Sequence, residues 1–97
     1  MKREVIRSLD AQNDMFNIWV YVAKDNLIAA DKLIDRFEEK FRFISENPLA
    51  GRNYDELKPG LRVTVEGYYA IFYKLLENGD IVIVNIIHTN RNINRLF

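Results

Sequence analysis

The chain has 97 residues, of which 48% are hydrophobic and 29% charged, a balance typical of one folded domain and unlike that of a disordered chain. Basic and acidic residues both number 14, so the formal net charge is zero and the chain lacks the basic excess of most nucleic-acid-binding domains. There is no cysteine and only one histidine, which excludes disulfides and thiolate metal sites, and we expect neither a metal nor a cofactor.

No segment of the sequence has the pattern of a targeting signal or a membrane span. The stretch MKREVIRSLD lacks the apolar core of a signal peptide, and no apolar run approaches the roughly 20 residues that cross a bilayer. We therefore predict one domain over residues 1–97, located in the cytoplasm, with no membrane partner. No acidic residue follows Asp80, so the C-terminal tail is locally basic.

Residues Val5 to Arg7 are predicted to form a short strand, and a first helix follows. Ser8 and Asp10 offer side-chain oxygens that can accept hydrogen bonds from free helix amides. The predicted helix covers residues 11–24, and its apolar residues share one face: Ala11, Met15, Ile18, Trp19 and Val22. Asp25 and Asn26 interrupt this pattern.

The second predicted helix has the clearest periodicity. Its apolar residues recur every three or four positions, at Leu27, Ala30, Ile34, Phe37, Phe41 and Ile44. Asn47 precedes a proline, which disfavours helical backbone, so we expect the helix to end near it. The short break between the two helices predicts an antiparallel helical hairpin.

After Gly60 the apolar period changes to two, which indicates strands. The first covers 61–66; the second, "YYAIFYKLL", is apolar on both faces, as expected for a central strand. Asn78-Gly79 is a strong signal for a tight turn, and "DIVIVNIIH" forms the third strand. The sequence therefore predicts an α+β domain of order β-α-α-β-β-β, with the N-terminal strand followed by an antiparallel helical hairpin packed on a C-terminal antiparallel sheet.

A turn-rich stretch, residues 47–62, connects the second helix to the sheet. Pro59 and Gly60 suit a turn, because proline fixes φ at its first central position. We expect this turn to deliver Leu61 to the core side of the first sheet strand and Arg62 to the other face.

Several short motifs, in order along almost the whole chain, resemble the ParE branch of the RelE/ParE toxin superfamily. They are "A-x-x-D-M-x-x-I-W-x-Y" from Ala11 to Tyr21, "P-x-x-G-R … L-x-x-G-L-R", "Y-x-I-F-Y" and "I-I-H-x-x-R". The matching downstream residues are Pro48, Gly51, Arg52, Leu57, Gly60, Leu61, Arg62, Tyr69, Ile71, Tyr73, Ile86, His88 and Arg91.

This resemblance implies the toxin of a bacterial type II toxin-antitoxin system, encoded beside a small antitoxin that keeps it silent. Toxins of the ParE type poison DNA gyrase by protein binding, whereas RelE-type relatives cleave messenger RNA on the ribosome. The implied partners are a cognate antitoxin, expected to be of the ribbon-helix-helix type, and DNA gyrase, with DNA reached only through the antitoxin. The family fold, a helical hairpin on an antiparallel sheet, agrees with the fold predicted above.

The ribonuclease alternative has definite candidate residues. RNA cleavage needs an acid/base pair and cationic groups around a charged phosphorane, and Arg62, His88 and Arg91 could supply them. The structural alternatives are a strand-end histidine satisfied by a backbone bond and an arginine paired with Glu66. Because the neutral net charge and a tail without tyrosine suit ribosome-directed cleavage poorly, we expect no catalytic residue. A degenerate toxin that retains only antitoxin binding is a third reading.

Two protein-binding surfaces are expected. Phe16, Val20, Leu33 and Phe43 lie off the main apolar stripes of the helices, and we expect them to bind the antitoxin. In the tail, Arg91 and Arg95 are expected to reach the target, with Leu96 or Phe97 as an apolar anchor.

Overall fold

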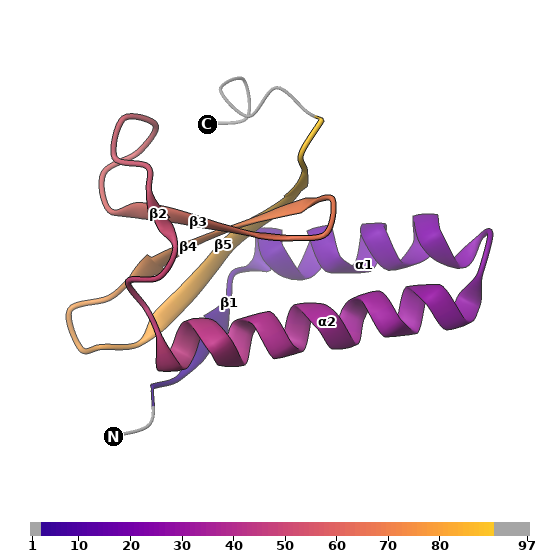
Figure 1. Ribbon diagram of the computed structural model, residues 1–97, viewed down its shortest axis with the longest axis horizontal. Helices are drawn as coiled ribbons and strands as arrows, with labels where there is room; N and C mark the ends of the chain where they lie inside the picture. The colour runs from indigo at the N-terminus through magenta and orange to yellow at the C-terminus, as the bar shows by residue number, and fades with distance from the viewer. Residues whose placement is uncertain (1–2, 91–97) are drawn as a thin grey trace.

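The computed structural model describes residues 3–90 of the chain. Its elements are β1 (Val5–Arg7), α1 (Leu9–Ala23), α2 (Leu27–Glu46), β2 (Arg52–Asn53), β3 (Leu61–Glu66), β4 (Tyr69–Leu75) and β5 (Ile81–His88). The two helices run side by side in opposite directions and are joined by a short turn at the right of Figure 1. The predicted α+β class, the helical hairpin and the three C-terminal strands are confirmed.

Side-chain caps fix where each helix begins. The Ser8 hydroxyl accepts a hydrogen bond from the Ala11 amide at 3.0 Å and donates one to the Val84 carbonyl at 2.8 Å, so it starts α1 and ties it to β5. The Asn26 side chain accepts from the Ala29 amide at 3.0 Å and starts α2. α1 therefore begins at Leu9, two residues before the predicted start.

The C-terminal strands β3, β4 and β5 are antiparallel, as predicted, and the N-terminal strand β1, whose pairing the sequence left open, makes the sheet mixed. Its strand order is β1-β5-β4-β3-β2, and β1 pairs with β5 in parallel, with Val5 opposite Ile81. The other pairings are antiparallel. The short edge strand β2 was not predicted, because two exposed residues carry no periodicity.

Both faces of the sheet are covered, each by a different part of the chain. The helices bury one face, where Ile71, Tyr73 and Ile83 meet Phe37 and other residues of the main core. On the opposite face Tyr54 and Leu57, from the segment between β2 and β3, pack on a second cluster formed by Leu61, Ala70, Phe72 and Ile87. In Figure 1 this segment lies at the upper left, away from the helices. The turn-rich connection therefore supplies a second, smaller core.

The face assignment of Leu61 and Arg62 follows from this arrangement. Leu61 is fully buried, but in the cluster beneath the 54–60 segment and not beneath the helices. Arg62, the next residue along the strand, has its side chain on the helix-covered face, opposite Tyr73 in the register. We had expected Leu61 to enter the main core, and the existence of a second core explains the difference.

The apolar face of α2 is broader than its predicted stripe. Leu33 is only 6% exposed and belongs to the main core, whereas Leu27, a member of the predicted stripe, is 56% exposed. The reason is that α2 packs against both α1 and the sheet, so its buried sector is wider than a single row of residues. Leu33 is therefore not available on the surface of the hairpin, and its predicted place among the antitoxin-binding residues is corrected.

Candidate functional site

A buried phenol anchors the connection between α2 and the sheet. The Tyr73 hydroxyl accepts a hydrogen bond from the Gly51 amide at 2.9 Å and donates one to the Pro48 carbonyl at 2.9 Å. A Cβ atom added at Gly51 would lie 2.3 Å from the Tyr73 oxygen, so only glycine fits there. Burial raises the pKa of the Tyr73 phenol, against the lowering effects of the Gly51 amide and the Arg62 charge.

The Arg62 guanidinium holds the same connection from its other side. It donates to the Gly51 carbonyl at 2.8 Å and to the Leu49 carbonyl at 3.3 Å. The expected partner Glu66 instead pairs with Arg36 and Lys40 of α2. Arg62 therefore has a structural role, with backbone carbonyls and not a carboxylate as its partners.

His88 lies at the end of β5 among aromatic rings. Its Nδ1 accepts a hydrogen bond from the Asn90 amide at 3.3 Å, the backbone bond that we considered as its structural role. Its ring stacks on Tyr68, with centroids 6.1 Å apart, and meets Tyr69 edge-on at 5.2 Å. Because Nδ1 is an acceptor in this arrangement, the neutral ring carries its proton on Nε2.

The proposed ribonuclease trio is not assembled in the described residues. Arg62, on β3, lies opposite Tyr73 of β4, and His88, on β5, lies opposite Tyr69 near the other end of β4. The two residues are therefore on the two strands that flank β4. Four residues along the strand, about 13 Å, and two strand spacings, about 10 Å, therefore separate their Cα atoms. The expectation that Arg62 lies near His88 is wrong. Arg91 lies outside the described residues.

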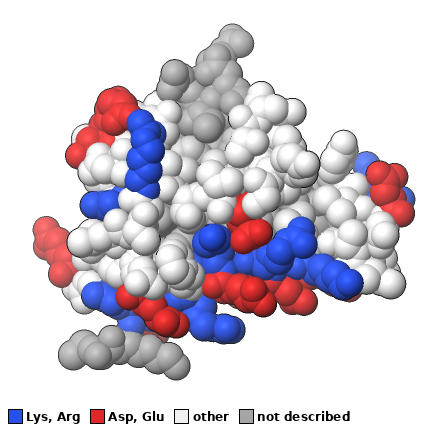
Figure 2. Space-filling model, in the orientation of Figure 1, with Lys and Arg blue, Asp and Glu red and all other residues white. Residues whose placement is uncertain are grey.

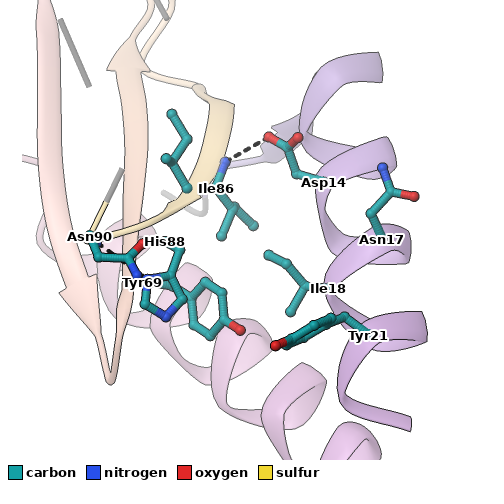
Figure 3. Close-up of a pocket in the computed structure, with 9 residues that line it drawn as sticks. Asp14, Asn17, Ile18, Tyr21, Tyr69, Ile86, His88 and Asn90 are labelled. Carbon is teal, nitrogen blue, oxygen red and sulfur yellow. Dashed lines mark hydrogen bonds between the residues drawn. The ribbon is translucent and has the colours of Figure 1, made fainter. Parts of the chain in front are cut away.

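A cavity of about 410 Å³ with mixed polar and apolar walls opens beside His88, between α1 and the end of β5. We call it the Asp14 pocket. It is lined by Asp14, Asn17, Ile18 and Tyr21 of α1, Tyr69 of β4, Ile86, Ile87 and His88 of β5, and Asn90. Figure 3 shows the Tyr21 and Tyr69 hydroxyls facing each other across its floor. Burial, and then the nearby Tyr21 phenol, raise the pKa of Tyr69.

Asp14 joins α1 to the open edge of β5. Its Oδ2 accepts from the Ile86 amide at 2.9 Å, drawn as a dashed line in Figure 3, and from the Asn85 side chain at 3.3 Å. β1 pairs with β5 only up to Ile83, so beyond that point no strand of residues 3–90 pairs with this edge of β5, and the carboxylate satisfies an amide there. We had not offered Asp14, Tyr21 or Tyr69 as site residues, although the first two belong to the motif quoted above for the first helix.

A second, mostly apolar groove of about 250 Å³ runs along the hairpin. It is lined by Arg7 of β1, by Gln12, Met15, Phe16 and Trp19 of α1, and by Ile34 of α2. Phe16 is 65% exposed there, and Val20, one turn further along α1, is half-buried. Phe43 is exposed on a different side of α2, where the Lys40 ammonium lies over its ring and also pairs with Glu66 of β3. The expected antitoxin-binding residues are thus divided between two sides of α2.

Charge is mixed on the face that Figure 2 displays. Lys and Arg side chains alternate with Asp and Glu along α2, and a broad uncharged area lies above them. Arg36 and Lys40 of α2 both form ion pairs with Glu66 of β3. Within residues 3–90 no group of three or more His, Cys, Asp or Glu is placed to hold a metal ion, and none of the helices there is both long and apolar enough to span a membrane. The expected target-binding residues Arg91, Arg95, Leu96 and Phe97 lie outside the described residues.

This fold, an antiparallel helical hairpin over a five-stranded mixed sheet, is shared by chains of two solved structures of toxin-antitoxin systems. A chain of a structure titled "Chromosomal ParDE TA system from P. aeruginosa" has a TM-score of 0.74 at 19% identity and covers 92% of this chain and 98% of its own. A chain of the toxin-antitoxin complex RelBE2 from Mycobacterium tuberculosis has a TM-score of 0.61 at 18% identity, over 91% of this chain and 99% of its own.

The sequence comparisons place the chain within this fold. The family described as the ParE toxin of the type II toxin-antitoxin system parDE matches residues 5–93. Toxin ParE3 of Caulobacter vibrioides is 31% identical over 91 residues, 92% of this chain and 89% of that protein. Toxin ParE1 of Mycobacterium tuberculosis is 27% identical over 66 residues, 68% of this chain and 67% of that protein. The chain belongs to the ParE toxin family of type II toxin-antitoxin systems.

Proposed function

We propose that this ParE-family toxin acts in the cytoplasm by binding DNA gyrase and poisoning it, without bond-making chemistry of its own. The observation that carries the proposal is the separation of Arg62 from His88, together with the engagement of the Arg62 guanidinium by two backbone carbonyls. Arg62 is therefore too far from His88 to stabilise a phosphorane formed beside it, so these two residues do not form a ribonuclease centre in this arrangement.

A cognate antitoxin of the ribbon-helix-helix type holds the toxin silent in this proposal, and DNA is reached only through it. The antitoxin lies along the helical hairpin and the adjoining sheet, and covers Phe16 and Val20 on one side and Phe43 on the other. Phe16 and Phe43 are 65% and 47% exposed, and large apolar side chains on a small domain favour a partner that buries them. The structural neighbours support this partner, because both titles name toxin-antitoxin assemblies.

Gyrase binding is assigned to the basic tail, through Arg91 and Arg95 with Leu96 or Phe97 as the anchor. The direct test is binding of purified toxin to immobilised gyrase, with and without an excess of antitoxin. We expect saturable binding that the antitoxin abolishes, and that falls as salt rises, since charge contacts on a surface are screened. Toxin that leaves gyrase unbound at low salt while still binding its antitoxin would contradict the gyrase assignment and leave the antitoxin assignment standing.

A further inference from the structure

The Asp14 pocket holds a negative charge that this part of the chain does not balance. Asp14 is half-buried, and both of its hydrogen bonds, from the Ile86 amide and the Asn85 side chain, reach Oδ2 from neutral donors. It forms no ion pair with any cation among residues 3–90. Within residues 3–90 Oδ1 has no hydrogen bond and is left as an acceptor for a charged donor, and such hydrogen bonds are stronger than neutral ones.

The backbone of β5 adds a second acceptor on the same side. The Thr89 amide bonds to the Tyr68 carbonyl at 2.8 Å, which sets the alternation of this antiparallel pair. The Ile86 amide and carbonyl consequently point away from β4, and the amide is the one that Asp14 accepts. The carbonyl lies on this same open edge, so the pocket wall offers a carboxylate oxygen and a carbonyl oxygen from neighbouring positions.

Aromatic side chains form the remaining walls. Tyr21 and Tyr69 lie across the floor of the pocket, and His88 closes one side (Figure 3). Tyr21 is 73% exposed, so its side chain is accessible to a ligand that enters the pocket. A planar cation can lie against the face of an aromatic ring while it donates hydrogen bonds from its edge.

The Asp14 carboxylate, the Ile86 carbonyl and the aromatic walls of the pocket together favour one kind of ligand. An anion is disfavoured by Asp14. A lysine ammonium is a strongly hydrated point charge that cannot stack, whereas a guanidinium is planar, weakly hydrated and has five donors in a fork that suits a carboxylate. We propose that the Asp14 pocket is a socket for an arginine side chain of the antitoxin.

The proposed function brings the antitoxin to α1, so the antitoxin is the source of this arginine in the proposal. Asp14 and Ile18 line the pocket while Met15 and Trp19 line the hairpin groove on the opposite face of α1, so an antitoxin that reaches both passes around this helix. The inference rests on the proposed function for the identity of the partner only. The chemistry of the socket is a property of the toxin alone and is tested on it directly.

The test uses Nα-acetyl-arginine N-methylamide as the probe and the citrulline derivative, which has the same length but no charge, as its matched control. Binding is followed by the amide NMR shifts of Ile86, His88 and Asn90 in the isolated toxin. We expect the arginine probe to bind at least about tenfold more tightly than the citrulline probe, as for a hydrogen bond gained to a charged group. The corresponding lysine derivative should fall between the two.

Asp14→Asn keeps an oxygen for the Ile86 amide and removes the charge, so it should reduce the arginine affinity about tenfold or more. Tyr21→Leu alters an exposed residue and should also weaken binding of the arginine probe. This second variant still tests the pocket if Asp14→Asn fails to fold. Asp35→Asn, an exposed acid of α2, is the matched control and should change nothing.

Equal binding of the arginine and citrulline probes, or an unchanged arginine affinity in both pocket variants, would overturn the socket. If the probe binds as expected but Asp14→Asn leaves antitoxin affinity unchanged, the antitoxin is not the source of the arginine and that part of the inference fails. If no antitoxin binds even the unmodified toxin, the proposed function fails and the probe result still decides the chemistry of the pocket.

Discussion

Gly51 and Tyr73 fit so closely that a Cβ atom on Gly51 would lie 2.3 Å from the Tyr73 hydroxyl oxygen. The same hydroxyl accepts from the Gly51 amide and donates to the Pro48 carbonyl. One side chain of β4 thus fixes the exit of the chain from α2, and with it the segment that covers the far face of the sheet.

Tyr73→Phe removes both hydrogen bonds and leaves a buried amide and carbonyl unsatisfied. We expect a loss of about 1–3 kcal/mol in the free energy of unfolding, measured by urea denaturation. Tyr68→Phe is the control, since Tyr68 is 74% exposed and should contribute nearly nothing by its hydroxyl. Equal stability of the two variants would show that the phenol does not anchor the connection.

Gly51→Ala tests whether there is room for a Cβ atom beside the Tyr73 ring. It does not test the backbone conformation, because Gly51 is not among the glycines with positive φ. The clash falls on a rigid aromatic ring, so we expect destabilisation of about 1–3 kcal/mol, typical of an overpacked core. Ala50→Ser enlarges the exposed preceding residue by a similar amount and should be close to neutral. Thermal unfolding of both variants provides the comparison, and a stable Gly51→Ala would refute the fit.

Titration of the buried phenol predicts how stability changes at high pH. The pKa of Tyr73 is raised above its ordinary value of 10.0, and that of Tyr69 is raised as well, in both cases chiefly by burial. Below that ordinary value both the folded and the unfolded chain keep these protons, so the two tyrosines do not make the free energy of unfolding depend on pH. As pH rises through it, the unfolded chain releases protons that the folded chain retains, and the free energy of unfolding falls.

We therefore expect urea midpoints to decline from about pH 9.5 to about pH 11, and to decline less in Tyr73→Phe, which has no phenol at that position. Tyr68→Phe serves again as the exposed control, and its urea midpoint should decline as that of the unmodified protein does. A decline of the same steepness in Tyr73→Phe would assign the effect to other groups.

Charge placed on the hairpin should weaken antitoxin binding. Phe16→Glu and Phe43→Glu alter exposed residues, so both should fold, and each should reduce antitoxin affinity by about thirtyfold if it is a central contact worth about 2 kcal/mol. Because the two residues lie on different sides of α2, an effect of only one variant would show which side the antitoxin covers. Leu76→Glu, in the turn between β4 and β5, is the control, and titration calorimetry measures all three.

How far the sequence predicted this fold depends on whether a feature is local. The periodicity of α2 and the change of period at Gly60 are local, and each was confirmed. The hairpin at Asn78-Gly79 was confirmed in its place, but only Gly79 has positive φ and the loop is longer than two residues. The parallel pairing of Val5 with Ile81 joins distant parts of the chain, and a three-residue strand carries no information about direction. Leu33 was misplaced because the width of a buried helical face depends on what packs against it.

The site shows the same limit. Spacing along β3 suggested Glu66 as the partner of Arg62, but the carbonyls that bind it come from a loop placed by tertiary contacts. Asp14 was within a quoted motif, yet its hydrogen bond to the Ile86 amide spans most of the chain and depends on where β1 ends. A β-bulge at Phe72 and Tyr73 also shifts which residues of β5 face the helices, and no turn signal marks it.

The basic tail is expected to carry toxicity separately from antitoxin binding. Deletion of residues 92–97, or the double variant Arg91→Glu and Arg95→Glu, should abolish growth arrest while antitoxin affinity stays within about threefold of the unmodified value, as for a rim contact. The variant Arg52→Glu, a charge reversal of an exposed arginine on β2, is the control and should remain toxic. A tail variant that is still toxic would show that the tail is not part of the target-binding surface.

The most direct test of protein binding as the mode of action places purified toxin in two assays side by side. One measures supercoiling by gyrase, and the other measures cleavage of messenger RNA on translating ribosomes, with His88→Ala included in both. We predict inhibited supercoiling, intact messenger, and no effect of His88→Ala beyond its influence on folding. Cleaved messenger with unimpaired supercoiling, and a loss of cleavage of roughly a hundredfold in His88→Ala, would contradict the account and establish a ribonuclease.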